Sequence, residues 1–139
     1  MPTPAVLHLL SLECLLAQEF DGDEIYLRLN GEKVWSVDRH AHMSHNLEKS
    51  NYFDIMDFAG GRRHGAAGWE PIPAFQAEAL TWSFDGEAVV EVYEADTLSS
   101  DDLIGRQYIS NQDAGRGAIT VHFERDGAHY ALTYRVDGA

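Results

Sequence analysis

Residues 89–106 have the sequence VVEVYEADTLSSDDLIGR. The stretch begins with apolar and polar residues in alternation, a pattern typical of a β-strand with one buried face. It then places the carboxylates of Glu94, Asp96, Asp101 and Asp102 within nine residues, and no Lys or Arg stands among them. A strand that leads directly into a crowded acidic loop indicates a β-rich fold in which the loops carry the chemistry.

Three two-residue turns separate further strands along the chain. Asn30-Gly31, Asp85-Gly86 and Asp126-Gly127 are each flanked by segments of alternating or β-branched residues, and turns of this kind adopt positive φ readily and join hairpins. Residues 5–17 predict another strand, and since both alternating sets are apolar, we expect it inside a sandwich. The sequence therefore predicts an all-β fold, an antiparallel β-sandwich of about seven or eight short strands.

Length and charge limit the possible functions. With 139 residues we expect a single domain over residues 1–139, in which the Gly-rich segment 38–73 is irregular and rich in loops. Ten Lys and Arg against 23 Asp and Glu give a formal net charge of −13, which repels phosphate backbones, so we expect no nucleic-acid partner. The single cysteine, Cys14, excludes an intramolecular disulfide and a cysteine-built zinc site.

The apolar segments are too short for a membrane span. None approaches the roughly 18 apolar residues that a transmembrane helix needs. The apolar stretch near the N-terminus is interrupted by Glu13, and no Lys or Arg precedes it, unlike a signal peptide. We therefore expect a soluble, cytoplasmic protein without a transmembrane segment.

The acidic residues are concentrated in two segments. Residues 13–24 and 91–102 together hold ten of the 23 acids and contain no Lys or Arg. If the two segments meet at one end of a sandwich, each close carboxylate pair costs about 3 kcal/mol at about 5 Å with an effective dielectric of about 20. A divalent cation would offset that repulsion. Ca²⁺, with roughly six to eight oxygen ligands in flexible geometry, suits loops of mixed Asp and Glu better than Mg²⁺.

Residues 92–106, VYEADTLSSDDLIGR, resemble the third calcium-binding loop of C2 domains, where a strand ending in Val-Tyr precedes acids in a D-x-D-x5-D spacing and then Ile-Gly. PIPAFQAEALTWSF (71–84) and GDEIYLRL (22–29) resemble the family's N-P-x-F-N-E segment and its D-P-Y-V-x-V strand. The resemblance covers 19–36 and 71–110. It implies an eight-stranded antiparallel sandwich of C2-like Greek-key topology, with Ca²⁺ held between loops at one end and, often, calcium-dependent docking to anionic phospholipid.

The resemblance also implies a set of carboxylate ligands from both acidic segments: Glu94, Asp96 and Asp102, with Asp23 or Glu24 as a fourth ligand and Asp21 or Glu19 as a fifth. Glu94 departs from the family pattern because it stands where the family has Asp, and the proline of D-P-Y is missing here. Segment 38–73 could add Asp54 or Asp57 if it folds over the loops.

Apolar loop residues are the candidates for membrane or partner contact. Leu98 falls where the family carries an apolar loop tip that inserts into lipid, and Phe20 is a second candidate from the first acidic segment. The lysine-rich strand with which some C2 domains bind phosphoinositides is absent, because the only lysines are Lys33 and Lys49. We therefore expect a Ca²⁺-binding module that engages an anionic phospholipid or a protein partner.

Other functions have weaker support. His40, His42 and His45 could ligate zinc or copper, but in a loop without cysteine we expect them to be solvated. Trp69, in the Gly-rich segment, is a candidate sugar platform, so a carbohydrate-binding or ligand-free scaffold sandwich is the alternative function. No nucleophile-elbow or comparable motif is present, and we expect no enzymatic activity.

Overall fold

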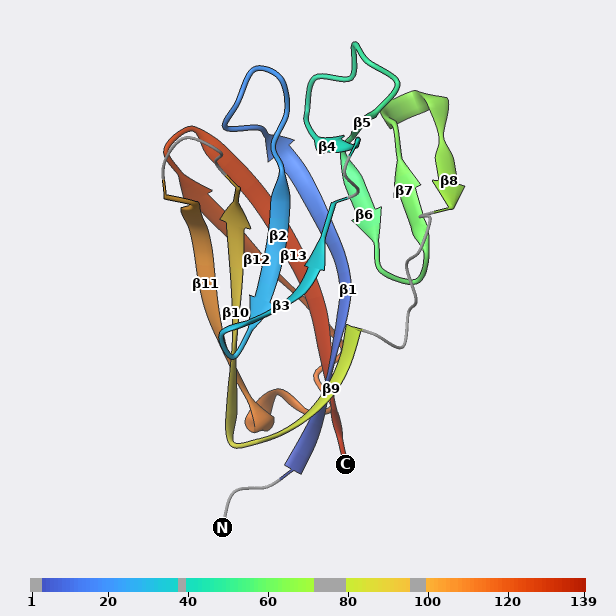
Figure 1. The fold of residues 1–139 in the computed structure, drawn as a ribbon. Coiled ribbons are helices and arrows are strands. Elements are labelled where there is room, and N and C mark those ends of the chain that lie inside the picture. Colours follow the sequence, from blue (N-terminus) through green and yellow to red (C-terminus); the bar gives the residue numbers. More distant parts are fainter. Residues whose placement is uncertain (1–3, 38–39, 72–79, 96–99) are drawn as a thin grey trace.

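The computed structural model describes residues 4–37, 40–71, 80–95 and 100–139 (Figure 1). Within these residues the regular elements are almost entirely strands: β1 (Pro4–Leu16), β2 (Ile25–Leu29), β3 (Glu32–Ser36), β4 (His42–Met43), β5 (Tyr52–Phe53), β6 (Ile55–Asp57), β7 (Gly61–Arg63), β8 (Trp69–Pro71), β9 (Thr81–Asp85), β10 (Glu87–Glu94), β11 (Asp102–Ser110), β12 (Ala118–Arg125) and β13 (Ala128–Gly138). Two 3-10 turns, η1 (Gly65–Ala67) and η3 (Asn111–Asp113), accompany them. Nowhere in this part of the chain does a helix reach the length and apolarity needed to cross a membrane.

All the strands of the described residues except β4 and β5, which pair with each other in parallel, form two facing sheets. The larger sheet has the order β12-β13-β1-β6-β7-β8, with β9 also paired to β1, and the smaller has the order β11-β10-β2-β3. Figure 1 shows the smaller sheet lying across β12, β13 and β1. The predicted all-β antiparallel sandwich is confirmed. Eight strands have five residues or more, and β4 to β8, with two or three residues each, lie in the segment predicted to be irregular.

Strand β1 is a central strand of the larger sheet and pairs with three others. It pairs with β13 along its length, while its other edge is shared by β9, along residues 4–8, and β6, along residues 11–13. The register shifts between Leu9 and Ser11, and an extra residue in a strand moves the following side chains to the opposite face. Leu9 is therefore buried before the shift and Leu12 after it, which explains why both alternating sets of the sequence are apolar.

Two of the three predicted hairpins are confirmed. Asn30-Gly31 joins β2 to β3 and Asp126-Gly127 joins β12 to β13, and all four residues have positive φ. The hairpin predicted at Asp85-Gly86 is wrong. Strand β9 pairs with β1, whereas β10 pairs with β2 and β11, so the chain crosses here from the larger sheet to the smaller one. Only Gly86 of this pair has positive φ, whereas a type I′ hairpin turn needs positive φ at both positions.

The core lies between the two sheets. Fully buried side chains come from the larger sheet, such as Leu7 and Leu132, and from the smaller one, such as Leu27 and Val90. The removal of this apolar surface from water is the main force that holds the sheets together. At the end of the sandwich opposite the C-terminus, Figure 1 shows the loop between β1 and β2 near the loop between β4 and β5.

Candidate functional site

An acidic cavity of about 200 Å³ lies at this end of the sandwich. Three segments meet there: the loop between β1 and β2, strand β4, and the end of β10. Among the described residues that line it, four are acidic and none is Lys or Arg: Glu19, Asp21, Gly22, Glu24, His42, Glu94 and Ala95. Carboxylates from both acidic segments therefore share the wall of one cavity.

Backbone contacts hold the three segments together. Asp23 and Met43 exchange two N–H···O hydrogen bonds at 2.8 and 2.9 Å, and the N–H of Ala95 donates to the carbonyl of Glu24 at 2.9 Å. Gly22 has a φ of +83°, and a Cβ at this position would lie 2.7 Å from the Cβ of His42. The close approach of the loop to β4 therefore requires glycine at this position.

Asp23 is fully buried and fixes the loop from inside. The backbone N–H groups of Gln18 and Glu19 each donate to its carboxylate at 2.8 Å, and the Tyr130 hydroxyl donates at 2.5 Å. Burial raises the pKa of Asp23 by more than these hydrogen bonds lower it. Both carboxylate oxygens are thus engaged within the protein. Of the two alternatives for a fourth ligand, it is Glu24 that lines the acidic cavity.

Glu94 and Asp102 are two of the three ligands predicted from the second acidic segment. Glu94 ends β10 and is only 4% exposed, and Asp102 begins β11 directly opposite it. Residues directly opposite in an antiparallel pair project from the same face of the sheet. The residue before Asp102, Asp101, accepts a hydrogen bond from the Tyr26 hydroxyl at 2.5 Å. Asp96, like Leu98, lies outside the described residues.

The oxygen donors of the acidic cavity are those that Ca²⁺ prefers. As the side chains stand, however, no three His, Cys, Asp or Glu residues within the described ranges are placed to hold a metal ion. The calcium site therefore stays a prediction. The acids supported by position are Glu19, Asp21, Glu24 and Glu94 in the cavity wall and Asp102 beside Glu94.

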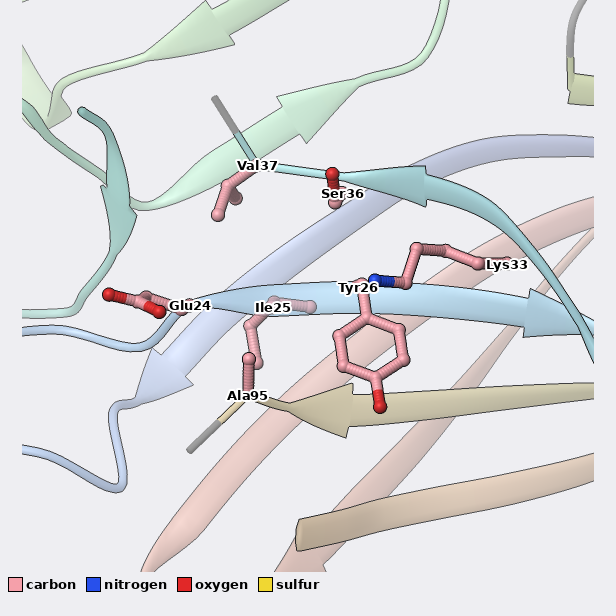
Figure 2. A pocket seen from close by; sticks show the side chains of 7 residues that line it. All are labelled: Glu24, Ile25, Tyr26, Lys33, Ser36, Val37 and Ala95. Atoms are coloured by element: carbon pink, nitrogen blue, oxygen red, sulfur yellow. The ribbon is translucent and has the colours of Figure 1, made fainter. Parts of the chain in front are cut away.

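A second cavity, of about 320 Å³, adjoins the acidic cavity and shares Glu24 and Ala95 with it. Figure 2 shows its lining residues, which come mainly from β2 and β3. The Lys33 ammonium lies 4.3 Å from the centre of the Tyr26 ring, and this ring stacks on Tyr93 with centroids 5.3 Å apart. Burial and the hydrogen bond to Asp101 raise the pKa of Tyr26 to about 12. Sequence reasoning missed this cavity because its residues are spread over separate strands.

Exposed apolar side chains lie at the same end of the molecule. Phe20, in the loop between β1 and β2, is 83% exposed, as a contact residue must be. Leu15 and Leu16, at the end of β1, are also exposed and were missed, because they continue an otherwise buried strand. Membrane contact by Phe20 stays a prediction.

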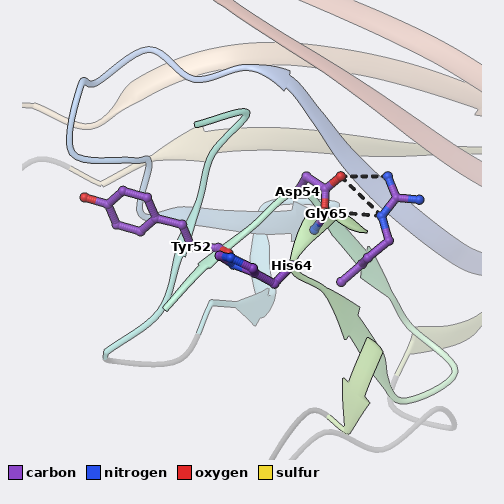
Figure 3. Close-up of polar contacts among 5 residues, drawn as sticks. Tyr52, Asp54, His64 and Gly65 are labelled. Atoms are coloured by element: carbon purple, nitrogen blue, oxygen red, sulfur yellow. Dashed lines mark hydrogen bonds and ion pairs between the residues drawn. The ribbon is translucent and has the colours of Figure 1, made fainter. Parts of the chain in front are cut away.

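In segment 38–73, the candidate ligand Asp54 and the side chain of His64 make hydrogen bonds to other residues of the same segment. Asp54 accepts hydrogen bonds from Arg63 and from the N–H of Gly65, with N···O distances of 2.6 and 3.0 Å, and Figure 3 shows Asp54 beside Gly65. His64 Nδ1 likewise contacts the carbonyl of Tyr52 at 2.5 Å. Asp54 therefore anchors β6 and β7 and does not line the acidic cavity.

The three loop histidines do not act together. His40 is exposed, His42 lines the acidic cavity, and His45 Nδ1 accepts a hydrogen bond from the N–H of Ala17 at 2.9 Å. The last contact ties the loop after β4 to the end of β1. Its role is structural.

No family model matches the chain, and no match to it was found among curated proteins. Among solved structures it matches a C2 domain at 13% identity over 97% of this chain and 98% of that one, with a TM-score of 0.46. It also matches a C2 domain of a plant extended synaptotagmin 1, at 9% identity over 100% and 98% with a TM-score of 0.45. A Drosophila C2-DSL-EGF1 structure matches at 9% identity over 96% and 67%, with a TM-score of 0.39. The chain is similar in fold to C2 domains. The likeness concerns fold alone.

Proposed function

We propose that this domain is a Ca²⁺-binding, C2-like module that acts by binding and not by catalysis. The acidic cavity carries the proposal. Glu19, Asp21 and Glu24 from one loop share its wall with Glu94 from β10, and no Lys or Arg is among the described lining residues. An arrangement of this kind favours a hard divalent cation that is held by oxygen.

The ion's contribution would be electrostatic. Bound Ca²⁺ would offset the repulsion among the carboxylates and present positive charge at the end of the sandwich. The protein's contribution is to fix the ligands: Asp23 and its three hydrogen bonds hold the first loop, and the pairing of Glu94 with Asp102 holds the second group. Asp96 would be the further ligand that this sequence places between Glu94 and Asp102 in the D-x-D-x5-D spacing.

The partner we propose is an anionic phospholipid surface. With a formal net charge of −13 the metal-free chain is repelled by anionic headgroups, so docking would require the ion. Phe20, Leu15 and Leu16 are exposed at the same end of the sandwich and would add apolar contact with the membrane interface. A protein partner with an acidic surface would also be attracted by the bound Ca²⁺, but its binding would not depend on these apolar side chains.

Thermal unfolding in EDTA, Mg²⁺ and Ca²⁺ tests the metal. A bound ion at a hundredfold excess over Kd stabilises by about 2.7 kcal/mol, a rise in Tm on the order of 5–10 °C for a domain of this size. We expect this rise in wild type with Ca²⁺ only, and its loss in Glu94→Gln. Glu87→Gln is the matched control, because Glu87 lies at the other end of β10. Equal shifts in both variants would contradict the proposal.

Sedimentation with vesicles tests the partner. Wild type should pellet with phosphatidylserine vesicles in Ca²⁺ and remain in solution in EDTA, and Phe20→Ser should pellet less. The carbohydrate alternative has one favourable observation, since Trp69 is 54% exposed whereas Trp35 is buried. It predicts a change in tryptophan fluorescence with oligosaccharide and no calcium-dependent pelleting.

A further inference from the structure

Two histidines and a glutamate form a cluster on the hairpin of β12 and β13, apart from the acidic cavity. His122 Nδ1 lies 2.9 Å from His129 Nε2, and His129 Nδ1 lies 3.1 Å from a carboxylate oxygen of Glu124. Glu124 and His129 are directly opposite in the antiparallel register. None of the three lines the acidic cavity, so the cluster is a separate feature of the molecule.

The Glu124 contact determines which ring nitrogen of His129 carries the proton. An ionised carboxylate only accepts hydrogen bonds, so Nδ1 of His129 is the protonated nitrogen. The lone pair of Nε2 then faces His122 Nδ1 at 2.9 Å. A histidine whose second nitrogen donates to a carboxylate is the usual form of a metal-ligating histidine, because the carboxylate fixes both the tautomer and the ring orientation.

The separation of the two facing nitrogens matches one coordination geometry. Two cis ligands of a square-planar or octahedral ion, each about 2.05 Å from the metal, lie about 2.9 Å apart, whereas two ligands of a tetrahedral ion lie about 3.3 Å apart. The observed distance is 2.9 Å. To bind one ion, His122 moves its proton from Nδ1 to Nε2, and the two rings turn so that both lone pairs point to an ion beside the N–N line.

We propose that His122 and His129 chelate a divalent transition-metal ion through these two nitrogens, and that Glu124 is the positioning residue for His129. Imidazole suits copper, nickel and zinc, and affinity for such ligands is highest for Cu²⁺, which also takes square-planar nitrogen ligands. The site supplies two protein ligands and leaves the other positions to water. It therefore differs from the proposed Ca²⁺ site in ligand type and in place.

Copper titration of the intact chain tests this proposal. We expect one tight Cu²⁺ per chain by calorimetry, and an electron paramagnetic resonance spectrum with coupling to two nitrogens. His122→Gln and His129→Gln should each weaken binding at least tenfold and reduce the coupling to one nitrogen. His40→Gln is the matched control, because it removes an exposed imidazole outside the hairpin of β12 and β13, and it should leave the affinity unchanged.

Glu124→Gln tests the positioning role. It keeps both ligands but removes the carboxylate charge, and loss of such a partner weakens metal binding by about 10–100-fold. The thermal unfolding temperature of the metal-free variant should match that of wild type, since Glu124 is exposed. The proposal is overturned if wild type binds no Cu²⁺ tightly, or if His129→Gln binds it as well as His40→Gln does.

Discussion

Glu94 and Asp102 stand directly opposite each other, at the point where β10 ends and β11 begins. Like charges directly opposite in a sheet destabilise it, by roughly 0.2–1 kcal/mol for a pair. We therefore predict that Asp102→Asn is more stable than wild type in EDTA by up to about 1 kcal/mol and less stable than wild type in saturating Ca²⁺. Urea unfolding in both conditions measures this change of sign. The same order of stability in both conditions would show that the pair does not bind an ion.

The buried Asp23 depends on Tyr130, which lies 107 residues away in sequence. Tyr130→Phe removes the hydroxyl donor but keeps the ring, so a buried carboxylate loses one of its hydrogen bonds. We expect a loss of about 1–3 kcal/mol in the free energy of unfolding. Tyr108→Phe is the control, because Tyr108 is an exposed tyrosine on β11. An equal effect of both variants in urea unfolding would mean that the hydrogen bond to Asp23 is unimportant.

Asp54 and Arg63 give the middle segment a defined pH dependence. Burial raises the pKa of Asp54, but hydrogen bonds from Arg63 and from the Gly65 N–H lower it further, so the pKa is below its ordinary value. The stabilisation is therefore complete above the unfolded-state pKa of about 3.9 and is lost as the pH falls through the lower folded-state pKa. We predict that Asp54→Asn costs about 1–2 kcal/mol at pH 7, and that this difference shrinks below about pH 4.

Glu70→Gln is the control for Asp54→Asn. Glu70 pairs with Arg62, and the side chain of Glu70 is half-exposed. Exposed pairs contribute about 0–1 kcal/mol. The free energy of unfolding, measured with denaturant between pH 2 and pH 7, should be lower for Asp54→Asn than for Glu70→Gln at neutral pH. In acid, Asp54→Asn should be as stable as wild type. A cost for Asp54→Asn that does not vary with pH would refute the assignment.

Gly105, of the Ile-Gly pair that follows the second acidic segment, lies against Phe123 on β12. A Cβ on Gly105 would overlap with Cγ and Cδ1 of the Phe123 ring, so the glycine lets the edges of the two sheets approach. Gly105→Ala should destabilise the fold by about 1–3 kcal/mol through overpacking. A double-mutant cycle with Phe123→Leu checks the cause. The double variant should be more stable than the sum of the single effects predicts, and simple additivity would exclude this contact as the reason.

Local sequence signals predicted those parts of the fold that local physics determines. Asn30-Gly31 and Asp126-Gly127 specify hairpins because both residues of each turn tolerate positive φ. Asp85-Gly86 has the same form, but the partner of β9 is β1, about 75 residues away in sequence, as the pairing of Leu7 with Trp82 shows. A local pattern does not distinguish a hairpin from a crossing between sheets.

The sequence indicated which carboxylates are candidates for the site, but it did not indicate which of their side chains line the cavity. The two acidic segments identified the carboxylates, whereas the choice between Asp23 and Glu24 depends on Tyr130, which no local pattern connects to them. The histidine pair was missed although a signal existed. The Asp126-Gly127 turn sets the register that places Glu124 opposite His129, with His122 as a diagonal neighbour on the same face.

Calorimetric titration of Ca²⁺ into the metal-free protein tests the central claim most directly. Wild type and Glu87→Gln should bind Ca²⁺ with equal affinity, and a Glu94→Gln/Asp102→Asn double variant that remains folded should lose at least tenfold in affinity, because it removes two charged ligands from the proposed site. Absence of Ca²⁺ binding by wild type, or unchanged binding by the double variant, would contradict the assignment of the acidic cavity as a calcium site.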